Sequence, residues 1–326
     1  MNRHWPEWSG TLQKRSGGWN NTTYIVGSGD NRAVLRIYNT HRDMDKIRFE
    51  HTVLQQLAGL SLPFGTPLPI TAVDGETLVQ LENGKYACLF RYIEGDSPGE
   101  EDERFYESLG SAAGILSQVL ATIHTDKPPV YRPYYELREA YPLCTDSSVR
   151  ELCLNPPQAL ADLAAELEIL YKAYTELADS LSGLAELPHQ LVHGDLNASN
   201  LLVKSDDHTL VAALLDFEFC TWDLRVMEPA VILSGLVGHG AEEAVVRDFW
   251  TGFSGQVQLS GAELEAIPAL MVLRKVDVFL HFTSRFFEGT DGAQVLREQV
   301  KLLSADLGEL SASAAQMMRI VNSHCS

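Results

Sequence analysis

The sequence predicts an α+β protein of two lobes, a small antiparallel sheet with one helix followed by a larger, mainly helical lobe. Residues 11–93 contain short β-branched and aromatic runs separated by turn residues, with one helical segment among them. Residues 94–103 are acidic and interrupted by Gly and Pro, which is typical of a boundary. Beyond them, long segments show the apolar spacing of helices. We therefore expect an N-terminal lobe over residues 1–95 and a C-terminal lobe over residues 96–326.

The strands of the first lobe are expected in two pairs. The runs "TTYIV" and "RAVLRIY" flank "GSGDN". We interpret "GSGDN" as a turn, because it leads into no helix and lacks the spacing of a dinucleotide-binding loop. The second pair lies in "ETLVQLENGKYACLFRY", where Asn83-Gly84 predicts a hairpin with a type I′ turn. That turn needs positive φ at both central residues, which Asn-Gly tolerates well.

Between the two pairs, residues 41–60 favour the one helix of this lobe. The apolar stripe of the helix runs through Ile47, Leu54 and Leu57. Glu50 falls on the same stripe. A carboxylate on the face that should point toward the core requires a partner there.

The second lobe should be mainly helical, with a Pro- and Tyr-rich connection ("DKPPVYRPYYELREAYPL") after its first helix. The apolar patterns predict helices at roughly 103–124, 157–184, 224–237, 241–253, 262–287 and 292–321. The only clear strands lie at the two apolar ends of "LVHGDLNASNLLV" and in "TLVAALLDFEF".

Composition limits the classes of partner. Acidic residues outnumber basic ones by 44 to 25, so the formal net charge is −19. A nucleic-acid-binding surface needs clustered Lys and Arg, and so does docking on an anionic membrane. We therefore expect no nucleic-acid partner and no membrane partner. A small or cationic substrate fits the charge better.

The five cysteines are widely spaced and form no CxxC pair, which disfavours a disulfide framework or a thiolate zinc site. The opening "MNRHWPEWSG" lacks the apolar core of a signal peptide. No apolar run approaches the length of about 20 residues that a membrane-spanning helix needs. We expect a cytoplasmic protein.

The stretch "LVHGDLNASNLLV", residues 191–203, places His193, Asp195 and Asn200 in a polar loop between two apolar runs. Such residues are also ordinary turn formers, and composition alone favours that simpler interpretation. A further carboxylate, Asp216, ends the apolar strand "LVAALLDF" sixteen residues after Asn200. The two features together favour a catalytic interpretation.

This pattern, His-Gly-Asp with four spacers before Asn and an Asp at the end of a later strand, resembles the catalytic core of the aminoglycoside phosphotransferase and choline kinase superfamily. Members of that superfamily have the protein-kinase-like fold. The order of elements agrees with that superfamily over nearly the full chain. The general appearance of the sequence is most similar to the homoserine-kinase-like and uncharacterised branch. The resemblance implies an ATP- and Mg²⁺-dependent phosphotransferase that moves the γ-phosphate to a hydroxyl of a small molecule.

The resemblance also assigns roles in the catalytic loop (191–203) and in a metal-binding strand end (214–219). Asp195 would accept the proton of the acceptor hydroxyl. Asn200 and Asp216 would be the protein ligands of Mg²⁺, a hard cation that prefers oxygen, with their oxygens converging from two adjacent strands.

In the first lobe, "SGGWNNTTY" stands where the superfamily places its phosphate-covering loop. Gly18 would allow close backbone approach, and Asn21 and Thr22 would donate hydrogen bonds to phosphate oxygens. A plain hairpin turn is the simpler interpretation of this segment. Arg36 would pair with Glu50 and hold the α- and β-phosphates. Protein kinases use Lys at that position, and the alternative for Arg36 is an ordinary solvent-facing side chain.

The strand "YACLFRYIEG" should lead into a hinge at about residues 90–95 that presents backbone groups to an adenine ring. Arg91, Tyr92 and Ile93 are the residues that we place there. Main-chain contacts should dominate, so their side chains say little about nucleotide preference.

The alternative function is a catalytically inactive relative that binds nucleotide or has a structural role. The presence of the base and both metal ligands disfavours it. The acceptor in this superfamily can be homoserine, an amino alcohol, a sugar or an aminoglycoside, and the sequence does not distinguish among them. We expect a monomer or a homodimer.

Overall fold

The computed structural model describes residues 1–8, 10–15, 21–39, 43–99, 102–178, 181–238 and 242–324. The chain packs as two compact units, each made of separate segments. The sheet unit comprises Met1–Phe105, Thr122–Val130 and Ala198–Cys220, and the helical unit comprises Tyr106–Ala121, Tyr131–Asn197 and Thr221–Ser326. These are units of packing, and the boundary between functional lobes near residue 95 stays a prediction.

In the described residues, the sheet unit is built on a six-stranded antiparallel sheet in the order β1-β2-β3-β6-β4, with β5 also paired to β6. Its strands are β1 (Leu12–Lys14), β2 (Asn21–Ser28), β3 (Asn31–Tyr38), β4 (Pro69–Ile70), β5 (Val79–Gln80) and β6 (Tyr86–Arg91). The predicted strand pairs are confirmed, and "GSGDN" forms the turn between β2 and β3 with Gly29 at φ +59°.

The predicted hairpin at Asn83-Gly84 exists, but its turn type was wrong. Only Gly84 has positive φ, at +79°, whereas a type I′ turn needs it at both central residues. The Gly84 N–H donates to Leu81 O at 2.9 Å, and the Leu81 N–H donates to Lys85 O at 2.8 Å. This pattern is a three-residue loop whose last residue is left-handed, which requires glycine at one position only.

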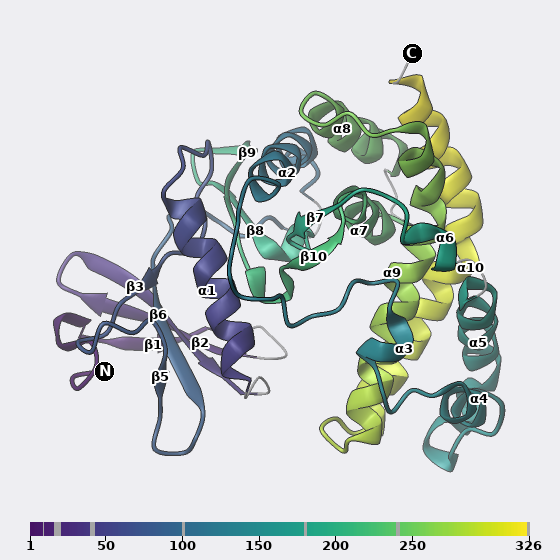
Figure 1. Ribbon diagram of the computed structural model, residues 1–326, viewed down its shortest axis with the longest axis horizontal. Helices are drawn as coiled ribbons and strands as arrows, with labels where there is room; N and C mark the ends of the chain where they lie inside the picture. Colours follow the sequence, from purple (N-terminus) through teal and green to yellow (C-terminus); the bar gives the residue numbers. More distant parts are fainter. Residues whose placement is uncertain are drawn as a thin grey trace. The chain divides into compact units, whose positions relative to one another are not determined.

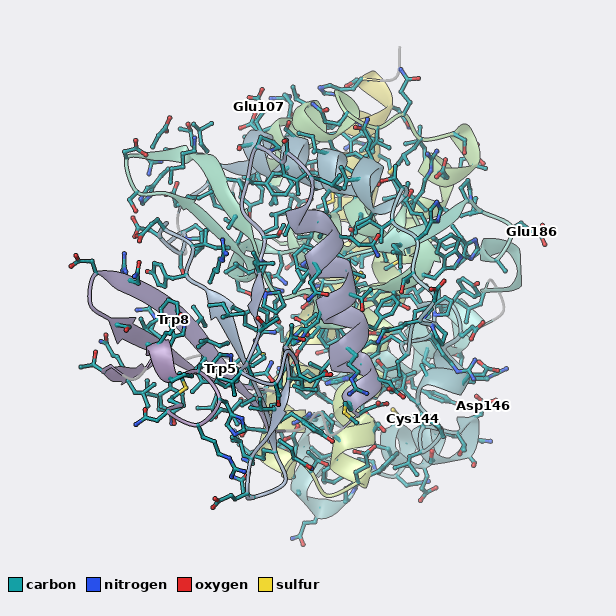
Figure 2. The ribbon with its side chains drawn as sticks, turned by 60° about the vertical axis from the view of Figure 1, so that its left-hand side comes forward. Trp5, Trp8, Glu107, Cys144, Asp146 and Glu186 are labelled. Carbon is teal, nitrogen blue, oxygen red and sulfur yellow. The ribbon has the colours of Figure 1, made fainter. Side chains whose placement is uncertain are left out.

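Helix α1 (Met44–Ala58) begins after Asp43, whose side chain accepts a hydrogen bond from the Asp45 N–H. The residues of its predicted apolar stripe are buried, and so is Glu50. A separate part of the core contains Trp5, with Trp8 packed against it (Figure 2). The Trp5 indole N–H donates to Ile70 O at 3.1 Å, so the N-terminal segment is fastened to β4.

A second antiparallel pair completes the sheet unit, β8 (Leu201–Lys204) with β9 (Asp207–Leu214), followed by a 3₁₀ turn (Phe217–Phe219). Backbone hydrogen bonds join this hairpin to the rest of the unit. Gly65 exchanges them with β9, from its N–H to Ala212 O at 2.8 Å and from the Leu214 N–H to Gly65 O at 3.0 Å. On the other strand, Asp96 and Val203 form a bridge with both N–H to O distances at 2.9 Å.

The helical unit carries the remaining helices and one short two-stranded sheet (Figure 1). Its elements are α2 (Tyr106–Leu120), α3 (Leu137–Ala140), α4 (Asp146–Leu154), α5 (Ala164–Ala178), α6 (Leu181–Leu184), α7 (Met227–Gly235), α8 (Glu242–Ser254), α9 (Gly261–Phe287), α10 (Ala293–Ser323), β7 (His189–Val192) and β10 (Thr221–Leu224). The two longest helices, α9 and α10, lie side by side (Figure 1).

Several details differ from the sequence prediction, among them the short helix α3 within the expected connection. Helix α4 was missed, although Thr145 is a good N-cap and accepts from the Ser148 N–H at 3.1 Å. The single helix expected over 157–184 is instead a 3₁₀ segment (Gln158–Leu163) followed by α5 and α6. Strand β10 was also missed, because a four-residue strand carries too little pattern to be distinguished from a loop.

Among the described residues, no helix combines the length and the apolar character that crossing a bilayer requires.

Candidate active site

The predicted metal ligands lie at one end of the β8–β9 hairpin. Asn200 ends a 3₁₀ turn directly before β8, and Asp216 follows β9. The Leu215 N–H donates to Asn200 O at 2.8 Å, so the backbone itself joins the two positions. The structure thus brings the two residues together through adjacent strands, in the manner that the sequence pattern predicts.

Asp216 has two unusual features. Among the described residues, it is the one non-glycine residue with positive φ, at +64°. Such a conformation costs free energy, about 1–3 kcal/mol, and is concentrated at functional sites. Its Oδ1 atom is buried and accepts no hydrogen bond from the described residues, although it lies 3.2 Å from Arg36 Nη1. A buried carboxylate oxygen that accepts no such hydrogen bond is well suited to bind a metal cation.

Arg36 and Glu50, predicted as a pair, are in contact. Arg36 Nη1 donates to Glu50 Oε1 at 3.2 Å, and the Tyr38 hydroxyl donates to Glu50 Oε2 at 3.2 Å. The Arg36 side chain is 14% exposed, so the solvent-facing alternative was wrong. Its guanidinium also faces the Phe90 ring, 5.3 Å from the ring centroid. The ion pair to Asp216 extends the predicted pair to the metal-ligand end of the hairpin.

Burial and neighbouring charges have opposite effects on the pKa values of Glu50 and Arg36. Burial raises the pKa of Glu50 from 4.5 to about 7, although Arg36 lowers it. Burial alone would lower the pKa of Arg36, but the carboxylates of Asp216 and Glu50 hold it well above its ordinary value. Arg36 therefore stays protonated, whereas the protonation state of Glu50 depends on pH.

The residues predicted for the phosphate loop are partly described. Gly18 lies outside the described residues. Asn21 Nδ2 donates to Glu218 Oε2 at 2.9 Å, and Thr22 Oγ1 accepts from Asn39 Nδ2 at 2.8 Å. Glu218, two residues after Asp216, is buried. The loop's first described residue is thus hydrogen-bonded to the segment that carries the predicted metal ligand, and its role toward phosphate stays a prediction.

The predicted hinge lies between two points of backbone attachment. The Arg91 N–H donates to Leu68 O and the Asp96 N–H to Val203 O, each at 2.9 Å. Within the described chain, the backbone of residues 92–95 makes no backbone hydrogen bond. The Tyr92 ring is covered by the Arg32 guanidinium at 4.1 Å.

Two glycines let the chain pass closely at this hinge. A Cβ on Gly65 would lie 3.1 Å from Ile93 Cγ2. Gly95 has φ +150°, and a Cβ there would lie 2.8 Å from Val203 O. The path of residues 92–95 therefore depends on two glycines, Gly95 within the segment and Gly65 against Ile93.

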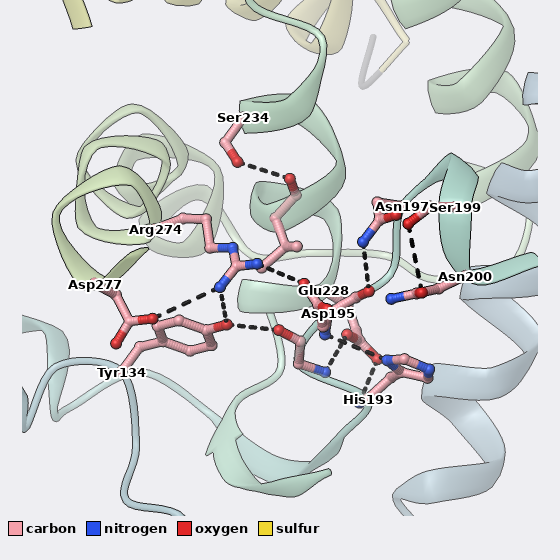
Figure 3. Close-up of polar contacts among 12 residues, drawn as sticks. Tyr134, His193, Asp195, Asn197, Ser199, Asn200, Glu228, Ser234, Arg274 and Asp277 are labelled. Atoms are coloured by element: carbon pink, nitrogen blue, oxygen red, sulfur yellow. Dashed lines mark hydrogen bonds and ion pairs between the residues drawn. The ribbon is translucent and has the colours of Figure 1, made fainter. Parts of the chain in front are cut away.

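In the helical unit, the His-Gly-Asp loop follows β7 and is held by Glu228 at the start of α7 (Figure 3). The His193 N–H donates to Glu228 Oε2 at 2.7 Å and the Gly194 N–H to Glu228 Oε1 at 3.1 Å. Gly194 has φ +80°, and the Asp195 N–H donates to His193 Nδ1 at 3.3 Å. Glu228 is fully buried, and burial raises its pKa.

The side chain of Asp195 forms an ion pair that the sequence did not predict. Arg274 of α9 donates from Nη2 to Asp195 Oδ1 at 2.5 Å (Figure 3). Arg274 Nη1 donates to the Tyr134 hydroxyl at 2.9 Å and lies 3.6 Å from Asp277 Oδ2. The Tyr134 hydroxyl in turn donates to Gly194 O at 2.6 Å. One arginine and one tyrosine thus contact the loop at two successive residues.

Buried carboxyls support this arrangement. The Tyr134 N–H donates to Asp223 Oδ2 at 2.6 Å, so Asp223 braces Tyr134, and α7 has no side-chain cap from it. Burial raises the pKa of Asp223 to about 7 and that of Asp277 to about 6. Burial would lower the pKa of Arg274, but Tyr134 and the carboxylates of Asp195 and Asp277 raise it above its ordinary value.

The phosphotransferase enzyme family model matches residues 11–264. The chain belongs to this family. It is 23% identical over 258 residues to the homoserine kinase of Agrobacterium fabrum, covering 78% of this chain and 73% of that one. It is 26% identical over 220 residues to the homoserine kinase of Methylobacillus glycogenes, covering 68% and 62%.

Solved structures of two small-molecule phosphotransferases have the same fold. A microcompartment-associated aminopropanol kinase matches with a TM-score of 0.66 at 17% identity, covering 98% of this chain and 95% of that one. A spectinomycin phosphotransferase in complex with ADP and spectinomycin matches with a TM-score of 0.63 at 14% identity, covering 96% and 95%. The predicted protein-kinase-like fold and small-molecule kinase class are confirmed.

Sequence reasoning about this phosphotransferase missed Arg274 and the roles of Tyr134 and Glu228. Arg274 lies in the apolar segment "ALMVLRKVDVFL", so it carried the same signal as Glu50, a charge within a buried helix face. Glu228 carries a similar signal, because it is a charge at the start of the apolar segment "PAVIL". Tyr134 lies in a connection without periodicity, where no pattern distinguishes a site residue from a core residue.

Proposed function

We propose that the chain transfers the γ-phosphate of ATP, in the presence of Mg²⁺, to a hydroxyl of a small molecule, with Asp195 as the base. The observation that carries the proposal is the cluster at the end of the β8–β9 hairpin. There Asp216 has a buried oxygen without a hydrogen bond from the described residues, next to Asn200 in the paired strands and to the Arg36 guanidinium.

The donor set at the hairpin end fits Mg²⁺. Asn200 and Asp216 offer one amide oxygen and one carboxylate, and Mg²⁺ is held in kinases by one or two such ligands together with phosphate oxygens. When bound, the ion neutralises charge that develops on the transferred phosphoryl group. The left-handed backbone at Asp216 fixes the direction in which its carboxylate projects.

The nucleotide would be held by the sheet unit. Arg36, kept in place by Glu50, would pair with the α- and β-phosphates, and Gly18, Asn21 and Thr22 would cover the phosphates. The adenine ring would receive hydrogen bonds from the backbone at Arg91, Tyr92 and Ile93. The unpaired backbone groups of described residues 92–95 support this last assignment.

Asp195 would take the proton of the acceptor hydroxyl. Glu228 holds the preceding backbone N–H groups, so the loop presents this carboxylate in a fixed orientation. Asp195 and Asn200 are five residues apart, which limits their Cα separation to about 18 Å however the two units are arranged. The base and a metal ligand are thus kept near each other by the chain itself.

The relatives narrow the acceptor. Homoserine is the first candidate, because curated relatives that match most of the chain are homoserine kinases. Aminopropanol and aminoglycosides are further candidates from proteins of the same fold. We also expect a cytoplasmic enzyme that acts as a monomer or a homodimer.

The test is release of ADP from Mg²⁺-ATP, measured in a coupled assay with homoserine, aminopropanol, choline and several aminoglycosides. Asp195→Asn serves as the blank, and its nucleotide affinity should match that of the wild type. Turnover should stop when EDTA removes Mg²⁺ and return when Mg²⁺ is restored. Turnover by Asp195→Asn at the wild-type rate would remove Asp195 as the base. No release of ADP with any acceptor, while nucleotide still binds, would favour an inactive relative.

A further inference from the structure

Arg274 has a hydrogen-bonding capacity that the described residues do not fill. A guanidinium carries five N–H donors in a fixed planar fork. Nη2 donates to Asp195 and Nη1 to the Tyr134 hydroxyl, with Asp277 also near Nη1. Within the described part of the chain, the Nε–H of Arg274 has no partner. The side chain is 20% exposed, so part of it faces solvent.

We infer that Arg274 recognises a carboxylate of the acceptor, while Asp195 receives the hydroxyl of the same molecule. The inference rests on the proposed kinase function, and it makes Arg274 a specificity-determining residue of that reaction. The acceptor class would be a hydroxy acid or hydroxy amino acid. An amino alcohol without a carboxylate would leave Arg274 without its ligand.

The chemistry of the fork supports a carboxylate in particular. Guanidinium binds carboxylates through parallel N–H donors, with directional and charge-assisted hydrogen bonds. Tyr134 and Asp277 hold the fork from the Nη1 side, so little side-chain freedom would be lost on binding. The positive charge of Arg274 attracts an anionic group, and the carboxyls of Asp195 and Asp277 offset part of that charge.

A simpler role would be to position Asp195 alone. The loop is already fixed by Glu228 and by His193, whose Nδ1 accepts from the Asp195 N–H. Positioning alone gives no role to the Nε–H donor, which has no partner among the described residues. The two roles differ in one measurable respect, because a positioning defect would lower turnover for every acceptor, whereas a recognition defect would depend on the acceptor carboxylate.

The experiment compares homoserine with 3-aminopropan-1-ol, which keeps the hydroxyl and the amine at the same spacing and replaces the carboxylate with hydrogen. We would measure kcat/KM for both acceptors with wild type, Arg274→Gln, Arg274→Lys and the control Arg285→Gln. Arg285 lies in the last turn of α9 and pairs with Asp291. Nucleotide affinity and circular dichroism would confirm that each variant is folded.

In Arg274→Gln, the homoserine-to-aminopropanol ratio of kcat/KM should fall about 10- to 100-fold, through the KM of homoserine, with the KM of ATP unchanged. Arg274→Lys should retain part of the ratio, and Arg285→Gln all of it. Equal losses for both acceptors would overturn the inference and assign Arg274 to positioning. A wild-type enzyme that prefers acceptors without a carboxylate would overturn it while leaving the kinase intact. Absence of turnover with every acceptor would overturn the proposed function, and the inference with it.

Discussion

Two partly buried arginines, one in each unit, hold the residues to which we assign metal binding and base catalysis. Arg36 in the sheet unit lies 3.2 Å from a carboxylate oxygen of both Glu50 and Asp216. Arg274 in the helical unit lies 2.5 Å from Asp195 and 3.6 Å from Asp277. Their side chains are 14% and 20% exposed, so both charges are largely removed from water and depend on their carboxylates.

The two arginines differ in what surrounds them. Arg36 lies against an aromatic ring and between a helix carboxylate and a strand-end carboxylate, which would hold the proposed metal ligand Asp216 beside the proposed phosphate-binding cation. Arg274 and Tyr134 both contact the loop of the proposed base, and Arg274 keeps an Nε–H donor without a partner among the described residues. The same side chain can therefore organise one ligand site or complete another, depending on what its remaining donors face.

The largest effect should follow from Arg36→Gln. The substitution leaves Glu50 and Asp216 without their shared cation, and loss of a preorganised charge of this kind costs about 10²–10³-fold in turnover. We expect that loss in kcat/KM for every acceptor, with weaker ATP binding by calorimetry. Arg48→Gln is the matched control, because Arg48 forms an exposed ion pair with Glu76 in the same unit. A loss confined to one acceptor would remove the distinction that we draw between the two arginines.

Arg36→Lys should have a smaller effect, about 10-fold, the equivalent of one charge-assisted hydrogen bond. Lysine restores the positive charge that protein kinases place on this strand, but it lacks the planar fork that meets Glu50 and Asp216 together. The measurement is the KM of ATP beside kcat in the same coupled assay. Activity as low as in Arg36→Gln would show that geometry, and not charge, is what this position supplies.

The sequence predicted Arg36 better than Arg274 for a physical reason. Glu50 interrupts an otherwise apolar stripe, which demands a partner, and the kinase-like order of elements supplies Arg36 on a neighbouring strand. On α9 two adjacent cations interrupt the apolar face. Adjacent helix residues point about 100° apart, so Arg274 and Lys275 cannot face the same group. In the structure Lys275 pairs with Asp306 of α10 at 2.6 Å, and only Arg274 reaches Asp195. The sequence alone does not reveal which of the two faces the site.

The prediction of helices and strands from the sequence has the same limit. Long periodic segments such as α9 and α10, and the strands β2 and β3, were predictable because their patterns extend over many residues. Strand β10 consists of four residues whose pairing with β7 is a tertiary contact. Tyr134 precedes the single turn of α3, and its place beside the base loop depends on Asp223 in β10. A residue whose position depends on a distant segment leaves no local signal.

Tyr134→Phe should reduce kcat by about 5-fold, the equivalent of about 1 kcal/mol. The change removes the donor to Gly194 O and the acceptor of Arg274 Nη1, and it leaves the ring in place. Tyr135→Phe is the control, because the Tyr135 hydroxyl contacts His189 at 2.9 Å and not the loop. Both variants would be assayed with homoserine and aminopropanol. Equal kcat values for the two variants would mean that Tyr134 contributes to packing alone and does not hold the base loop.

The smallest effect concerns pH and the sheet unit. Burial raises the pKa of Glu50 from 4.5 to about 7, so the folded protein keeps a proton that the unfolded chain releases in that interval. This contribution to stability is complete below pH 4.5 and is lost as pH rises through 7. Glu50→Gln cannot lose it, and the amide can still accept from Arg36 and contact Tyr38. The melting temperature of the variant relative to wild type should therefore rise by ~2–6 °C between pH 5 and pH 8, measured by scanning calorimetry.

The control is Glu94→Gln, which changes an exposed carboxylate of the same unit and should show no such trend. If Glu50→Gln and wild type change in parallel between the two pH values, Glu50 is ionised throughout and the Arg36 pair outweighs burial. A rising difference would instead show that burial keeps Glu50 protonated at pH 5, so that the ion pair between Arg36 and Glu50 forms only as pH rises.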